Sequence, residues 1–185
     1  SPGDTLRNTG PPPLDQAMDL LGFPEEVNVL SRLGRFDTFG DADDYAKIIL
    51  MVPGKPWIDI EISSCDCYAP YLYKIMGSEG CLRATLGCVE YKYVDKSKLT
   101  PRSQIMEPLC KPDGTPSYCT EKLEFIEEKI EVESGAFNRA VKDYYDMIYY
   151  ALTEGRPMEI TPEQVLTQLK VIDKIHAQTP LTVFA

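Results

Sequence analysis

Few side chains in this sequence combine the chemical type and spacing that catalysis or metal binding requires. The only histidine, His176, lies near the end of a helical stretch, a position typical of a surface or hydrogen-bonded residue. The pair Cys65 and Cys67 has metal-ligand chemistry but lacks the second pair of a tetrahedral zinc site. Strand alternation places both thiols on one face, where buried thiols act as small hydrophobic groups. We therefore predict no catalytic residue and no metal ligand here.

The sequence also lacks a nucleotide-binding glycine loop. A Gly-x-Gly-x-x-Gly loop turns a strand into a helix whose N-terminus meets the pyrophosphate. The nearest match runs from Gly77 to Gly80, lies between predicted strands and contains an acidic residue, so we interpret it as a turn. This pattern predicts that the chain alone binds no cofactor.

Other chemically capable side chains have structural interpretations. Asp15 and Asp19 share a helix face, which we interpret as a solvated face rather than a catalytic carboxylate pair. Arg7 and Trp57 suit either a pocket or an interface, and the sequence favours neither role. Core and interface packing accounts for four clustered tyrosines without a ligand: Tyr144, Tyr145, Tyr149 and Tyr150.

Size and charge narrow the class of protein. The chain has 185 residues, of which 43% are hydrophobic and 26% charged, so we predict a single globular domain over residues 1–185. A formal charge of −10 argues against binding to nucleic acid or to an anionic membrane surface. No apolar stretch approaches the roughly 20 residues of a membrane span.

The start of the chain and its cysteines bear on its cellular location. The sequence begins at Ser1 and shows no signal peptide, so we expect an upstream segment to have been removed or the chain to be part of a longer protein. We predict a cytoplasmic protein, with an exported parent left open. Six cysteines suit a reduced domain, and we expect free thiols.

The elements that would hold these side chains follow from local patterns. Residues 1–13 predict a loop in which three prolines enforce an extended backbone. A helix follows and ends at Gly22 and Pro24, with Leu14, Met18 and Leu21 on its apolar face.

From about residue 26 to 132 the hydrophobic pattern has period two, which predicts strands. Gly54 and Lys55 predict a hairpin turn, and residues 95–122 a long irregular excursion. The strand candidates are residues 26–35, 44–52 and 56–64, two or three strands within 71–93, and residues 123–132.

The C-terminal part predicts two helices. Gly155 ends the first, and a capping box of Thr161 and Gln164 with Pro162 begins the second. The predicted apolar faces are Phe137, Val141, Tyr144, Ile148 and Leu152 in the first helix, and Val165, Leu166, Leu169 and Ile172 in the second. Successive strands with helices at both ends favour an α+β fold: an open, mostly antiparallel β-sheet with helices packed on one face.

Three segments carry a resemblance to a known family. The stretch 149–176, YYALTEGRPMEITPEQVLTQLKVIDKIH, resembles the end of the C-terminal domain of the Gfo/Idh/MocA family of NAD(P)-dependent sugar and polyol dehydrogenases. Residues 75–84, IMGSEGCLRA, resemble a hairpin of that family's sheet domain. Residues 3–24 resemble the family segment that precedes a helix ending in Leu-Gly-x-Pro. The resemblance covers nearly all of residues 3–178 and is loose through 95–122.

The N-terminal segment departs from the family pattern at two positions. Aligned at Asp15, it places Asn8 where the family usually has an aspartate and Pro12 where it has a histidine. Those two family side chains, with a lysine of the nucleotide-binding domain, bind substrate and transfer a proton. Asn8 can hydrogen-bond a hydroxyl but is no base, and proline has no titratable group. The resemblance implies substrate binding by Arg7, Asn8, Thr9, Pro12 and Asp15, and no catalytic residue.

The resemblance also implies cofactor and partners. The full-length protein would use NAD or NADP on a sugar or polyol, and this chain would lack the N-terminal nucleotide-binding domain. Its sheet face would form a homodimer or homotetramer. Alone it would have no turnover, because hydride transfer needs a positioned cofactor. The alternative is a non-catalytic carbohydrate- or protein-binding module that retains the fold, which Asn8 and Pro12 favour.

Overall fold

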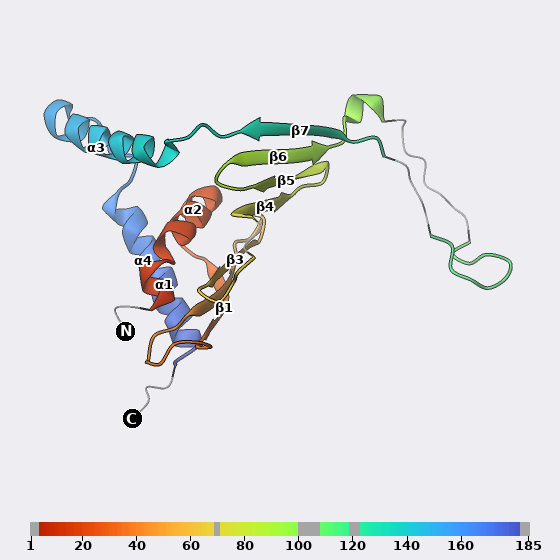
Figure 1. Cartoon of the computed structure of the whole chain (residues 1–185), viewed down its shortest axis with the longest axis horizontal. Coiled ribbons are helices and arrows are strands. Elements are labelled where there is room, and N and C mark those ends of the chain that lie inside the picture. The colour runs from red at the N-terminus through yellow and green to blue at the C-terminus, as the bar shows by residue number, and fades with distance from the viewer. Residues whose placement is uncertain (1–3, 69–70, 100–107, 119–122, 182–185) are drawn as a thin grey trace. The chain divides into compact units, whose positions relative to one another are not determined.

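The computed structural model describes residues 4–68, 71–99, 108–118 and 123–181 (Figure 1). The chain divides into two compact units, each considered by itself. The first unit comprises Ser1–Tyr68 and Tyr144–Ala185, and the second comprises Ala69–Asp143.

The first unit holds a three-stranded antiparallel sheet of order β1-β2-β3. Its strands confirm the three predicted from residues 26–64: β1 (Asn28–Gly34), β2 (Tyr45–Met51) and β3 (Ile58–Ser63). The predicted hairpin turn is also confirmed, since the Lys55 N–H donates to the Val52 carbonyl oxygen at 3.1 Å and Gly54 has φ +75°. Glycine is suited to that positive φ because it has no Cβ.

Helices cover this sheet and form a core with it. They are α1 (Thr5–Asn8), α2 (Pro11–Leu21) and α4 (Pro162–Gln178), and α4 packs against β1 and α2. Every second residue of β2 is fully buried, as period two predicts. The core comprises chiefly Ala46, Ile48 and Leu50 of β2, Leu14, Met18 and Leu21 of α2, and Val171, Ile172 and Ile175 of α4.

Side chains of α4 also satisfy the free edge of β1. The Gln178 Oε1 atom accepts from the Ser31 N–H at 2.8 Å, and its Nε2 donates to the Val29 carbonyl oxygen at 2.5 Å. Lys174 Nζ donates to the Val27 carbonyl oxygen at 3.1 Å. These bonds pair backbone groups that an edge strand otherwise leaves to solvent.

Two sequence predictions about this unit are wrong. The prolines at 11–13 do not enforce an extended backbone but form the first turn of α2, where a missing N–H and a fixed φ are tolerated. In α4, Val165, Leu166 and Leu169 are each about half exposed, and only Ile172 of the predicted stripe is buried. The buried face consists instead of Gln168, Val171, Ile172 and Ile175, which follow helical spacing.

The second unit holds a four-stranded antiparallel sheet of order β4-β5-β6-β7. Its strands are β4 (Tyr73–Met76), β5 (Gly80–Ala84), β6 (Cys88–Tyr93) and β7 (Ile126–Glu131), which confirms three strands within residues 71–93 and one within 123–132. In the predicted excursion, a short 3₁₀ helix (Lys96–Lys98) and a bridge between Cys110 and Pro116 are described. Residues 100–107 and 119–122 of that excursion lie outside the described residues.

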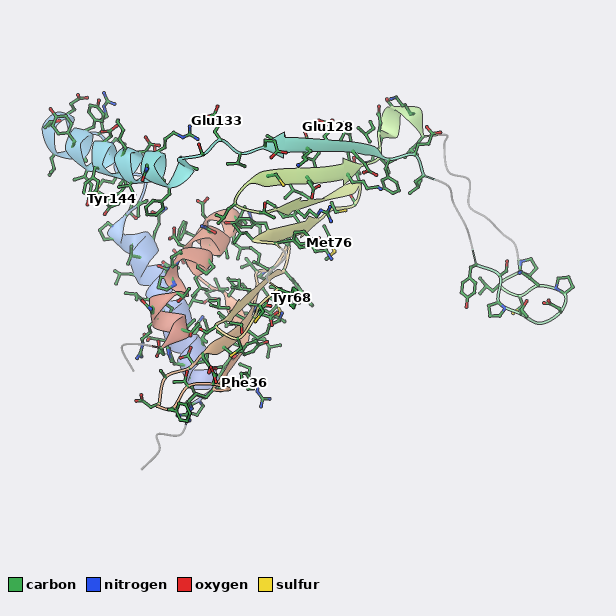
Figure 2. All side chains as sticks on the ribbon, in the orientation of Figure 1. Phe36, Tyr68, Met76, Glu128, Glu133 and Tyr144 are labelled. Atoms are coloured by element: carbon green, nitrogen blue, oxygen red, sulfur yellow. The ribbon has the colours of Figure 1, made fainter. Side chains whose placement is uncertain are left out.

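The predicted helix ends near the C-terminus are confirmed. Helix α3 (Ala136–Glu154) ends at Gly155, which has φ +67°, and the capping box of Thr161 and Gln164 begins α4. Side chains such as that of Tyr144 project from α3 along its length (Figure 2), and none of the helix's described side chains is buried. The antiparallel α+β class is confirmed, with the strands hydrogen-bonded as two sheets.

Candidate functional site

The segment with the predicted substrate-binding residues joins α1 to α2. Arg7 and Asn8 end α1, Thr9 is its C-cap, and Pro12 lies in the first turn of α2. The side chains of Arg7, Asn8, Thr9 and Pro12 are exposed, and Asp15 is half-buried. The first four therefore lie at the surface of the first unit within six residues of the chain, with the buried Gly10 between them.

Gly10 allows this tight connection. Its N–H donates to the Thr5 carbonyl oxygen at 3.0 Å, and a Cβ built at position 10 would lie 2.2 Å from the Leu6 carbonyl oxygen. Real Cβ atoms do not approach backbone oxygens so closely, so only glycine fits without a backbone shift. The glycine thereby keeps Thr9 at the end of α1 and Pro12 at the start of α2.

Two buried aspartates hold the segment in place. Asp4 is the N-cap of α1, and its Oδ1 accepts from the Arg7 N–H at 2.8 Å. The Asp43 Oδ2 accepts from the Leu6 N–H at 2.9 Å, and the Asp43 carbonyl oxygen accepts from the Thr5 N–H at 2.9 Å. The loop before β2 is thus bonded to the backbone of α1.

A third anchor comes from α4. The buried Gln168 donates its Nε2–H to the carbonyl oxygen of Pro11. Sequence reasoning missed Gln168 and Asp43 because their partners lie far along the chain. Asp4 was also missed, although its position as the N-cap of α1 is a local signal. A polar residue within an apolar helix face was the one available signal for Gln168.

The chemistry of the segment is hydrogen bonding rather than proton transfer. Arg7 offers a guanidinium that is about half exposed and lies 3.8 Å from Asp4 Oδ2. Asn8 and Thr9 offer an amide and a hydroxyl, and Pro12 offers neither donor nor base. Burial raises the pKa of Asp15, and the charge of Asp19 raises it further. The half-buried Asp15 and the exposed Asp19 lie four residues apart on α2, as predicted.

Other sequence candidates lie elsewhere. Cys65 and Cys67 follow the end of β3 and are exposed, so the prediction that strand alternation buries them is wrong. All five described cysteines are free thiols, as expected, and Cys119 lies outside the described residues. Residues 77–80 form the predicted turn, in which the Gly77 N–H donates to the Gly80 carbonyl oxygen at 2.8 Å. Trp57 is three-quarters exposed.

A cavity of about 750 Å³ lies in the second unit beside that turn. Met76, Cys81, Val94 and Phe125 are among its lining residues, and an ion pair of Glu79 with Lys96 lies at its wall. It contains none of the predicted substrate-binding residues, so the described geometry does not assign it to the same site.

Solved structures share this fold. An oxidoreductase from Bacillus cereus matches with a TM-score of 0.69 and 14% identity over 99% of this chain and 51% of its own. An NAD-binding protein from Listeria innocua matches with a TM-score of 0.64 and 17% identity over 96% of this chain and 50% of its own. An oxidoreductase from Agrobacterium radiobacter was solved in complex with NAD+, L-tartaric acid and magnesium. It matches with a TM-score of 0.60 and 16% identity over 93% of this chain and 46% of its own.

This chain therefore spans about half the length of the structures it matches. No curated protein matches its sequence. Within the described residues, no helix has both the length and the apolar character needed to cross a membrane. Residues 3–179 match the oxidoreductase family's C-terminal alpha/beta domain, and the chain belongs to this Gfo/Idh/MocA family.

Proposed function

We propose that residues 1–185 act as one substrate-side and oligomerisation domain of an NAD(P)-dependent sugar or polyol dehydrogenase. The observation that carries this proposal is the match of residues 3–179 to the family's C-terminal domain. The nucleotide-binding domain is the partner that would supply NAD or NADP, since hydride transfer needs a cofactor held against the substrate carbon. Free thiols on the five described cysteines support a reducing compartment such as the cytoplasm.

The Arg7–Pro12 segment would form one wall of the substrate pocket. Its polar side chains are exposed while its backbone is fixed by Asp4, Asp43 and Gln168. A fixed backbone with exposed donors suits recognition of several hydroxyl groups, because little conformational freedom is lost on binding.

The sheet of the second unit supports self-association. Its register places Tyr73, Ile75 and Ile130 on the same face as Leu82 and Val89, while Lys74, Arg83, Glu90 and Lys129 align on the opposite face. Ile75 and Ile130 are about half exposed. This face is mainly apolar, and its one carboxylate on β7, Glu128, is bonded to Tyr91 and Tyr93. A mainly apolar face opposite a charged one supports a homodimer or homotetramer through the apolar face.

The activity test uses the full-length protein with NAD+ or NADP+ and a panel of sugars and cyclic polyols. We expect reduction of the nicotinamide with one substrate class, and a rise in KM of about tenfold or more in Arg7→Ala through loss of charged hydrogen bonds. Lys55→Ala, in the exposed β2–β3 turn, is the matched control and should keep the wild-type KM. Absence of turnover across the panel would contradict the enzymatic proposal.

The isolated chain provides a second test. Because no phosphate-binding glycine loop is present in its sequence, calorimetry with NAD+ or NADP+ should give no specific heat of binding. Micromolar affinity would mean that the domain has been assigned wrongly.

A second candidate function is a non-catalytic carbohydrate- or protein-binding module. Asn8 and Pro12 favour it, since neither side chain can act as a base. Replacing Pro12 by His in the full-length protein distinguishes the two functions. Position 12 is exposed in the first turn of α2, so a histidine can be accommodated there. Activity should rise if the enzyme lost its proton-transfer group and should not change if the module never catalyses.

A further inference from the structure

A group of ionisable side chains in the first unit is not explained by substrate binding. Asp4, Asp43 and His176 come from the start of α1, the loop before β2 and the end of α4. One ligand atom from each lies within 4.8 Å of the other two. Both aspartates are buried, with 3% of their surface exposed, and the imidazole is mostly buried.

The hydrogen bonding of His176 fixes which nitrogen faces the carboxylates. Its Nδ1 lies 3.0 Å from the Ile172 carbonyl oxygen, which can only accept, so Nδ1 carries the hydrogen. In the neutral ring, Nε2 then presents a lone pair. That atom is buried, has no hydrogen-bond partner and lies 3.6 Å from Asp4 Oδ2.

A lone pair directed at two buried carboxylates is unfavourable, and either a proton on Nε2 or a metal cation among the three side chains relieves it. The two aspartates are both buried and each offers a carboxylate oxygen within 4.8 Å of the other's, so they repel each other when both are ionised. A positive charge among the three side chains would remove both conflicts.

The donor set fits a divalent transition-metal cation. Two carboxylate oxygens and one imidazole nitrogen are ligands for Zn²⁺ and Mn²⁺, and a carbonyl bond to the second ring nitrogen is the usual support of a metal-bound histidine. Ligands about 2.1 Å from such an ion lie about 3.4 Å apart at tetrahedral angles. The 3.6 Å separation of His176 Nε2 from Asp4 Oδ2 is close to that value, and all three ligand atoms lie within 4.8 Å of one another.

We propose that Asp4, Asp43 and His176 form a binding site for one divalent transition-metal cation. The ion would join α1, the β1–β2 loop and α4 at the base of the Arg7–Pro12 segment. Its role would be structural, and the proposal does not depend on the proposed dehydrogenase function.

Mn²⁺ is the probe for the test, because it prefers oxygen and nitrogen ligands and so discriminates against the exposed thiols. Loss of the free Mn²⁺ signal in electron paramagnetic resonance, followed during titration of the chain, measures binding. We expect one Mn²⁺ per chain and a rise in Tm with Mn²⁺ concentration. Absence of saturable Mn²⁺ binding would overturn the proposal. A proton on Nε2, rather than a metal, would then satisfy the buried nitrogen.

Two variants identify the ligands. His176→Asn keeps a donor for the Ile172 carbonyl but removes Nε2, and Asp43→Asn keeps an acceptor for the Leu6 N–H. Each should weaken Mn²⁺ binding by at least about tenfold while the circular dichroism spectrum remains unchanged. Asp19→Asn, at an exposed position of α2, should bind as the wild type does. Equal binding by His176→Asn and wild type would also overturn the proposal.

Discussion

The two antiparallel sheets are built from the same alternating pattern but differ in how they are covered. In β2 of the first unit, Ala46, Ile48 and Leu50 are fully buried beneath helices. In the described part of the second unit, Ala84 and Val94 are the only buried hydrophobic residues. Ile75 and Ile130, on the apolar face of β4 and β7, are about half exposed.

The difference between the two sheets shows that alternation determines which side chains share a face but not whether that face is covered. Period two determines which side chains share a face, and it does so in both sheets. Whether that face is covered depends on amphipathic helices elsewhere in the chain, which α2 and α4 provide for the first sheet. In the second sheet, polar side chains of neighbouring strands are hydrogen-bonded to one another, as where Tyr91 and Tyr93 donate to Glu128 on β7.

The largest expected effect is on the core of the first unit. Ile48→Ala removes a fully buried side chain and leaves a cavity, so unfolding should become easier by about 2–5 kcal/mol. The matched variant Ile75→Ala, at a half-exposed position of β4, should cost well under half as much. Urea denaturation with hydrogen exchange resolved by peptide assigns each loss to its unit. Equal losses would contradict the contrast between the sheets.

Self-association provides a second test of the difference between the two sheets. If the apolar face of the second sheet pairs with another copy, Ile130→Lys should bury a charge there and weaken the dimer by tenfold or more. Sedimentation of wild type and variant over a range of concentrations measures this effect. Lys129→Ala, on the opposite face, is the control and should leave the assembly intact. A monomeric wild type at high concentration would remove the oligomerisation proposal.

Local patterns were sufficient to predict most elements. Isoleucines at every second position predicted β3, and Gly22, Gly155 and the Thr161 capping box predicted helix ends. The prolines before Leu14 led to a wrong prediction of extended backbone, because a proline is compatible with both an extended backbone and a first helical turn. The buried face of α4 could not be read from hydrophobicity, since Gln168 is inside and Leu166 is outside.

The site was less predictable than the fold. The resemblance indicated Arg7 and Asn8 as candidate substrate-binding residues, but nothing local indicated that Asp43 and His176 converge on Asp4. Their contacts depend on how the helices pack, and packing brings together residues that share no sequence pattern. Asp44 was missed for a different reason: its hydrogen bonds lie within the loop after β1 and depend on the folded shape of that loop, which no sequence pattern indicated.

Asp44 gives a pH-dependent test within the first unit. Its buried carboxylate accepts from the backbone N–H groups of Phe36, Asp37 and Thr38 at 2.6–3.0 Å. Burial alone would raise its pKa, but these bonds outweigh burial and hold the pKa below the ordinary 3.8. This contribution to stability is therefore complete above pH 3.8 and is lost as the pH falls through the lower, folded-state pKa.

Asp44→Asn should accordingly cost about 1–3 kcal/mol near neutral pH and flatten the acid limb of the stability profile. Urea midpoints measured from neutral pH down to below pH 3.8 test both parts of this expectation. Asp41→Asn, at an exposed position of the same loop, should change neither the stability near neutral pH nor the acid limb. An unchanged acid limb in Asp44→Asn would show that other carboxylates dominate acid unfolding.

The smallest expected effect concerns the start of α4, which covers the first sheet. The Thr161 Oγ1 atom accepts from the Gln164 N–H at 3.3 Å, and the Gln164 Oε1 accepts from the Thr161 N–H at 2.7 Å. Thr161→Ala removes one of these bonds and should cost about 1 kcal/mol, which Thr161→Ser should largely restore. Thr167→Ala, at a half-buried position within the same helix, should be neutral or slightly stabilising because alanine is the better helix former. Exchange protection should therefore fall in α4 and its sheet for Thr161→Ala alone, while that of β4–β7 stays unchanged.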